Sequence, residues 1–224
     1  MFKQPEIPSQ AELPVSDEEL LEFSLKLLYQ FYYFEPNASR LQLMIESNIL
    51  DSWQTMFSLE LMTTKEWLLQ PLHFELLKDD HLNLFVGLGM PEAAPWGSVY
   101  LHEDNLLMQS STYELDSFLR RMGLIFKLDE YQPVDHIGLC LSALVELLHR
   151  SRITRDVSDR RAVVEFLSIH LLPWAQQFCG LLILNAKTPL YKDLGSVTHH
   201  LLIYLKEEYD VTCDERKLYW PINE

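Results

Sequence analysis

Apolar side chains recur at helical spacing along most of the chain, beginning directly after a helix-start signature at Ser16 and Glu19. A serine followed three residues later by a glutamate is a capping box, which satisfies free N–H groups of a first helical turn. Two adjoining apolar lines follow with a period of 3.6 residues, one with Leu20, Phe23, Leu27, Phe31 and Phe34, the other with Leu21, Leu25, Leu28 and Tyr32. Glu22 precedes Lys26 by four residues on the polar face, in the orientation of a helical ion pair. We therefore predict a helix that lies on a core and ends near Pro36.

The next fifty residues continue in the same manner. Residues 37–70 contain neither proline nor glycine, which favours two helices with a short break near Asp51 and Ser52. A further helix should run from about Pro71 to Val86. Regularity then stops, because Gly87, Gly89, Pro91, Pro95 and Gly97 fall within eleven residues and no regular helix accommodates them.

Helical patterning resumes in the second half of the chain. Helices are expected over 112–122, closed by Gly123, over 159–171 and over 176–186. Pro133 and Pro189 are each expected in the first turn of a helix. The Pro133 helix carries Ile137, Leu141, Leu144 and Leu148, and the Pro189 helix carries Leu190, Leu194, Val197, Leu201 and Leu205.

These elements predict an all-α fold. We expect a single compact helical domain of about ten helices over residues 16–224, with one irregular loop rich in glycine and proline, and a flexible tail over residues 1–15. Composition agrees, since 48% of the residues are hydrophobic and only seven are glycine, which leaves few of the turns a sheet-rich fold needs.

The net charge of the chain limits the kinds of partner that it can bind. The formal net charge of −15 creates a negative field that disfavours nucleic acid and anionic lipid and favours a cationic peptide. The stretch between Glu165 and Lys187 has no charged residue over 21 positions, but polar residues and Pro173 interrupt it, so we predict two buried helical segments and no membrane span. Three widely spaced cysteines make neither a disulfide framework nor a zinc site.

Known catalytic signatures do not occur in the sequence. Glu146 and His149 have the spacing of a helical di-iron ligand pair, but the second copy that such a site needs is missing, so a surface pair is the better interpretation. Gly97 and Ser98 lack the rest of a nucleophile elbow, and there is no phosphate-binding loop. Arg120 and Arg121 are expected on a solvated helix face. We predict no metal and no cofactor.

Two features remain as candidates for function. The loop 91–100 contains a Pro-Trp-Gly turn that would present Trp96 and Tyr100, whose large rings make extensive contacts. The second feature is Asp135 with His136 at a predicted helix start. Both have a structural alternative: Trp96 as a core anchor, and Asp135 as a partner of a helix N-terminus.

Together these features resemble the TorD/DmsD/NarJ family of redox-enzyme maturation chaperones. The resemblance rests on Leu-Phe-Val-Gly at 84–87, Pro-Trp-Gly-Ser-Val-Tyr-Leu at 95–101 and Pro-x-Asp-His at 133–136. His-Leu-Leu-Pro-Trp at 170–174, Pro-Leu-Tyr at 189–191 and Leu-Gly at 194–195 are similar to the DmsD branch in particular. The resemblance extends from about Ser16 to Leu205, with the motifs in the same order and at the same spacing.

The resemblance implies a cytoplasmic, non-catalytic chaperone. Its partner would be the twin-arginine leader of a molybdopterin-containing reductase subunit, similar to dimethyl sulfoxide reductase. The chaperone would hold this subunit back from Tat export until its cofactor has been inserted. Tat translocase components would be further partners. By this analogy nine residues line or support the peptide site: Leu84, Phe85, Pro95, Trp96, Gly97, Ser98, Tyr100, Asp135 and His136. The chain departs from the family pattern at His81, Gly89, Ala94 and His102. Alternatives are a metal- or nucleotide-dependent helical enzyme, or a constitutive subunit of a complex.

Overall fold

The computed structural model describes residues 16–87, 89–127 and 132–220. The predicted tail at residues 1–15 lies outside these residues. Within them the chain forms helices and no strand: α1 (Asp17–Tyr33), α2 (Ala38–Glu46), α3 (Ile49–Phe57), α4 (Lys65–Leu68), α5 (Pro71–His81), the π-helical η1 (Leu82–Val86), α6 (Gly97–Leu101), α7 (Ser110–Arg121), α8 (Ile137–Thr154), α9 (Val157–Glu165), the π-helical η2 (Phe166–Leu171), α10 (Leu172–Asn185) and α11 (Pro189–Glu208). The predicted all-α single domain is confirmed.

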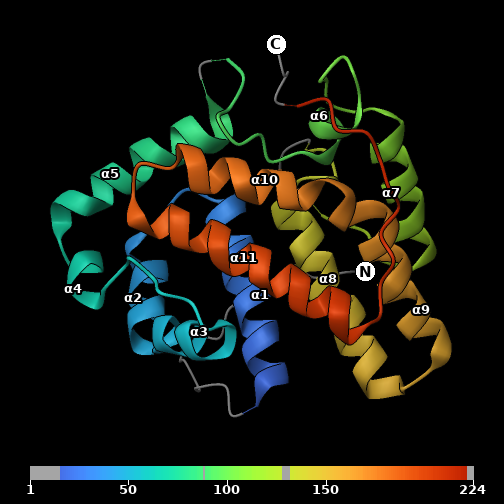
Figure 1. Cartoon of the computed structure of the whole chain (residues 1–224), viewed down its shortest axis with the longest axis horizontal. Helices are drawn as coiled ribbons and strands as arrows, with labels where there is room; N and C mark the ends of the chain where they lie inside the picture. The colour runs from blue at the N-terminus through green and yellow to red at the C-terminus, as the bar shows by residue number, and fades with distance from the viewer. Residues whose placement is uncertain (1–15, 88, 128–131, 221–224) are drawn as a thin grey trace.

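The core lies where α1 packs along α8 and where α10 packs along α11 (Figure 1). Both predicted apolar lines of α1 are buried up to Tyr32, and all five aligned apolar residues of α11 have no exposed surface. Tyr32 links the two layers, since its hydroxyl donates to the Leu194 carbonyl at 2.9 Å. Cys140 and Cys179 are packed in this core.

Local signals at the ends of helices are also confirmed. Ser16 and Glu19 form both hydrogen bonds of the capping box, and Lys26 donates to Glu22 at 2.6 Å. Gly123 follows α7 with φ of +72°, a left-handed conformation that suits glycine. Arg120 and Arg121 lie on a solvated face, where they pair with Asp116 and Glu165.

Two predicted boundaries are wrong. The break after α2 falls at Ser47 and Asn48, where Asn48 adopts φ of 55°, and Asp51 and Ser52 lie inside α3. Asparagine tolerates this left-handed conformation better than most residues, so it marks the break. Pro133 is outside α8, whose N-cap is His136. The Pro133 carbonyl accepts from the His136 N–H at 3.2 Å and closes a turn instead.

The predicted segments over 159–171 and 176–186 form one continuous helical run from α9 through η2 to α10. Across η2 the Leu172 N–H reaches back five residues to Leu167, and Pro173 follows with no N–H to donate. By length and composition alone this run, Val157–Asn185, could cross a membrane. Half of its most apolar window is buried inside the domain.

Candidate binding site

The structure joins the two sequence features into one site. Trp96 and His136 form an isolated antiparallel bridge. On either side of it the Gly97 N–H donates to the Asp135 carbonyl at 3.0 Å and the Ile137 N–H donates to the Pro95 carbonyl at 2.7 Å. The start of α6 and the start of α8 are therefore held together by backbone hydrogen bonds.

Asp135 is a buried carboxylate with only one satisfied oxygen. Its side chain is 3% exposed, and Oδ2 accepts from the Ser98 N–H at 2.7 Å and from the Thr112 hydroxyl at 3.1 Å. Oδ1 has no hydrogen-bond partner among the described residues. The structural alternative is thus partly correct, because Asp135 stabilises the start of α6, not the start of its own helix. The remaining oxygen is free to accept from a cationic group.

Asp135 also borders a small cavity. This cavity has a volume of about 10 Å³ and is shared with Gly97, His170, Trp174 and Arg216. That volume is about what one water molecule needs. A larger ligand group therefore reaches Asp135 only if one of the neighbouring side chains moves.

His136 is neutral in this environment. Its Nδ1 accepts from the Gly138 N–H at 3.0 Å, so the ring proton lies on Nε2. Burial lowers the pKa of His136 to about 3, with a smaller contribution from the neighbouring His81. The ring meets Trp96 edge to face at 5.7 Å. His136 therefore positions Trp96 and supplies no charge at neutral pH.

Trp96 is partly exposed, but Tyr100 is not. The prediction that the loop presents Tyr100 is wrong: Tyr100 has no exposed surface, donates from its hydroxyl to the Ala94 carbonyl at 2.7 Å and stacks on Trp174. Trp96 is half-buried and its Nε1 has no partner among the described residues. Of the two aromatic rings, Trp96 is the one available to a ligand.

The other candidate residues form the buried frame of the site. Leu84 and Phe85 are buried on η1, where the Leu84 carbonyl accepts from the Ala93 N–H at 2.9 Å and fixes the loop. Ser98 is buried, and Pro95 supplies the bridge carbonyl. Gly97 lies against Trp174, because a β-carbon there would come within 2.7 Å of the indole.

Four apolar side chains on η1, the loop and α10 are exposed, which was not predicted. They are Leu82, Val86, Met90 and Leu184, each at least 45% exposed. Leu82 and Val86 belong to η1, and the Asn185 side chain ties the end of α10 to the loop through the Glu92 carbonyl at 2.9 Å. Only Val86 lay within a quoted motif, and helical spacing alone does not show which apolar residues stay exposed.

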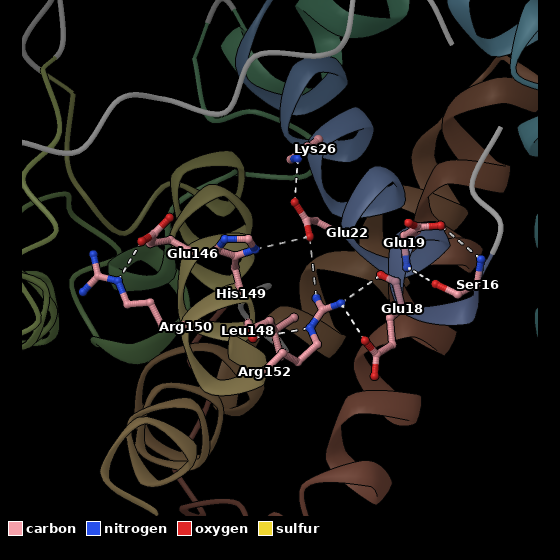
Figure 2. A network of polar contacts seen from close by, with 10 residues as sticks. All are labelled: Ser16, Glu18, Glu19, Glu22, Lys26, Glu146, Leu148, His149, Arg150 and Arg152. Atoms are coloured by element: carbon pink, nitrogen blue, oxygen red, sulfur yellow. Dashed lines mark hydrogen bonds and ion pairs between the residues drawn. The ribbon is translucent and has the colours of Figure 1, made fainter. Parts of the chain in front are cut away.

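The possible metal pair at the end of α8 is a surface ion-pair network (Figure 2). Glu146 accepts from Arg150 at 2.7 Å, and His149 lies 3.9 Å from Glu22 of α1. No group of three or more histidine, cysteine or acidic side chains among the described residues is arranged to hold a metal ion. The geometry matches the surface interpretation of Glu146 and His149.

Comparison with known proteins gives one family. A family model described as "Nitrate reductase delta subunit" matches residues 51–180, a range that contains every candidate site residue. The chain is 26% identical over 174 residues to the "Tat proofreading chaperone DmsD" of Salmonella typhimurium, covering 77% of this chain and 82% of that protein. It is 27% identical over 177 residues to the "Probable Tat proofreading chaperone DmsD" of Haemophilus influenzae, covering 77% and 83%. A "Chaperone protein TorD" of Vibrio vulnificus is 29% identical over 106 residues, covering 46% and 49%.

Proposed function

The chain belongs to the nitrate reductase delta subunit family, and from this premise we propose that it is a redox-enzyme maturation chaperone that binds the twin-arginine leader of a molybdopterin-containing reductase subunit. It does so in the cytoplasm, before Tat export, and without catalysis. The relatives named as Tat proofreading chaperones and TorD chaperones support this role.

One observation carries the proposal for the site. A half-buried tryptophan and a buried carboxylate with one unpartnered oxygen lie on the two sides of the same backbone bridge. A twin-arginine leader joins two guanidinium groups to an apolar helical segment, so its receptor needs an acceptor beside an apolar surface. Asp135 supplies the acceptor, and Trp96 supplies apolar surface. The remaining residues of the predicted set hold these groups in place.

Calorimetric titration with leaders from several molybdopterin reductases tests the function. We expect micromolar or tighter binding to one leader, and at least about tenfold weaker binding to its lysine–lysine variant, because lysine lacks the planar fork of donors. A folded protein that binds no leader would contradict the proposal and favour metal or nucleotide assays. Co-purification with one partner at fixed stoichiometry would favour a constitutive subunit.

Substitutions in the same titration test the site. Trp96→Ala and Asp135→Asn should each weaken leader binding by about tenfold or more, because each removes a central contact. Trp67→Ala is the matched control, since Trp67 is also half-buried but belongs to α4, where it stacks on His73. Equal effects of Trp67→Ala and Trp96→Ala would remove Trp96 from the site.

A further inference from the structure

After α11 the chain runs in an extended conformation over residues 211–220, which we call the C-terminal strap. Figure 1 shows it passing alongside α7 towards α6. Two backbone hydrogen bonds hold it: the Asp214 N–H donates to the Ser168 carbonyl at 3.0 Å, and the Tyr219 N–H donates to the Tyr100 carbonyl at 2.8 Å. The strap therefore bridges η2 and the candidate site.

The first anchor depends on the π-helical turn. In the register of η2 each N–H reaches the carbonyl five residues earlier, as Leu172 reaches Leu167. The next residue in that register is Pro173, which has no N–H to give to Ser168. The Ser168 carbonyl is thus left for an outside donor, and the strap supplies the Asp214 N–H.

Arg216 points from the strap into the candidate site. Its side chain is only 26% exposed, Nε lies 3.1 Å from Asp214, and Nη2 lies 3.6 Å from Glu114 of α7. Arg216 also lines the cavity that Asp135 borders. The guanidinium group thus lies between the carboxylates of Asp214 and Glu114, on the same cavity as Asp135.

The order of residues in the strap matches the chemistry of the proposed ligand. Arg216 and Lys217 form a basic pair, and Leu218, Tyr219 and Trp220 follow as an apolar run. Beside Glu114, the partner of Arg216, an open groove of about 560 Å³ lies between α7 and η2. It is lined by Tyr113, Phe118 and Ile169 with Glu114, Glu165 and Arg121, the last two of which pair with each other. The groove and the Asp135 cavity meet at His170. Carboxylates beside apolar surface suit a basic and apolar peptide.

Resting on the proposed function, we propose that the C-terminal strap is an internal ligand, in which Arg216 occupies the subsite for a leader arginine and the leader displaces the strap. A ligand that competes with an attached segment binds only the fraction of molecules in which that segment is detached, so its apparent affinity is lowered. The strap thus sets a threshold that favours leaders with a full set of contacts.

Titration of the full-length chain with a twin-arginine leader tests this proposal. Arg216→Gln should strengthen leader binding by at least about fivefold, because the internal competitor is weakened. Lys217→Gln is the matched control: it removes the same charge from an exposed side chain that lies over the Tyr219 ring, and should change binding by less than about twofold. Equal effects of the two substitutions, or no gain with Arg216→Gln, would overturn the proposal.

Hydrogen exchange on the wild-type chain gives a second measurement that needs no variant. Saturating leader should speed exchange of the Asp214 and Tyr219 amides, since their acceptors lose the strap. A leader that binds while these amides stay protected would overturn the strap proposal and leave the chaperone proposal standing. Absence of leader binding by folded wild-type and Arg216→Gln chains would overturn both.

Discussion

Asp80 and Asp135 are both buried carboxylates that hold a distant segment, but they differ in how their oxygens are used. Asp80 is 1% exposed, and both of its oxygens accept hydrogen bonds: the Lys187 N–H contacts both at 3.1 Å, and Thr188 gives its N–H at 2.8 Å and its hydroxyl at 2.6 Å. Asp135 accepts from Ser98 and Thr112 through one oxygen, and the other has no partner among the described residues.

We propose that this difference separates a structural corner at Asp80 from a binding corner at Asp135. A buried polar atom without a partner costs free energy, which a water molecule or a bound group can restore by completing the hydrogen bond. Both oxygens of Asp80 already accept hydrogen bonds, and these bonds fix the start of α11. Asp135, in contrast, directly precedes the residue that bridges to Trp96, and it borders the cavity that Arg216 also lines. On this proposal the same residue type has a different role in the two corners.

The same substitution at both aspartates should give the largest effect and the clearest test. In Asp80→Asn one amide NH2 must face backbone donors, so we expect the free energy of unfolding to fall by about 3 kcal/mol. In Asp135→Asn the NH2 can take the place of the unpartnered oxygen, and the loss should stay within about 1 kcal/mol. Urea unfolding at pH 7 measures both.

Asp79→Asn is the control for this pair, because Asp79 is the exposed neighbour of Asp80. Its stability should change by no more than about 0.5 kcal/mol. If Asp135→Asn were as destabilising as Asp80→Asn, Asp135 would be a structural residue like Asp80, and the distinction between the two corners would be lost.

Gly97 offers the next test of the binding corner. A β-carbon there would lie 2.7 Å from Trp174, which stacks on Tyr100, so Gly97→Ala should lower the free energy of unfolding by about 1–3 kcal/mol through overpacking. Thermal unfolding measures the loss. The matched control is Gly180→Ala inside α10, where nothing lies within 4 Å of the added carbon.

Gly180→Ala should raise stability by about 0.5–1 kcal/mol, because alanine favours the helix. Similar gains in both variants would mean that the contact between Gly97 and Trp174 yields easily. The buried residues around Trp96 would then be less rigid than the packing of Tyr100 against Trp174 indicates.

Features encoded by neighbouring residues were predictable from the sequence. The capping box, the two apolar lines of α1 and the apolar face of α11 depend on spacings within a few turns, and the structure confirms them. Asn48 shows the limit of this approach: its left-handed backbone ends α2, yet no glycine or proline marks the position. The extra short helix α4 was missed for the same reason, since only Thr64 marks its start.

Features made by distant residues were predictable only in part. The motifs identified Trp96 and Asp135 as candidates, but their joining through a bridge and the burial of Tyr100 under Trp174 depend on residues far apart in the chain. Two further features have no periodic pattern in the sequence at all. They are the docking of Arg216 beside Glu114 and the Ser168 carbonyl that Pro173 leaves without a helical donor. Local pattern determines helices, whereas the site depends on how their ends meet.

The smallest expected effect is the pH dependence of stability at the binding corner. Burial lowers the pKa of His136 to about 3, while an unfolded histidine has a pKa of about 6.5. Its contribution is present above pH 6.5 and is lost as the pH falls towards 3, because the unfolded chain binds the proton first. Between pH 6.5 and pH 5 we expect His136 to account for a loss of about 1.5 kcal/mol in the free energy of unfolding.

The variant His136→Asn tests this expectation. Asparagine keeps an N-cap acceptor for Gly138, so the variant should reduce the fall in unfolding free energy by that amount, as measured by urea unfolding at the two pH values. His81 and His170, whose pKa values burial lowers to about 4, remain in the variant and supply the rest of the slope. An unchanged slope would show that His136 is solvated, and the corner around Asp135 and Trp96 would then be more open than the buried corner of Asp80.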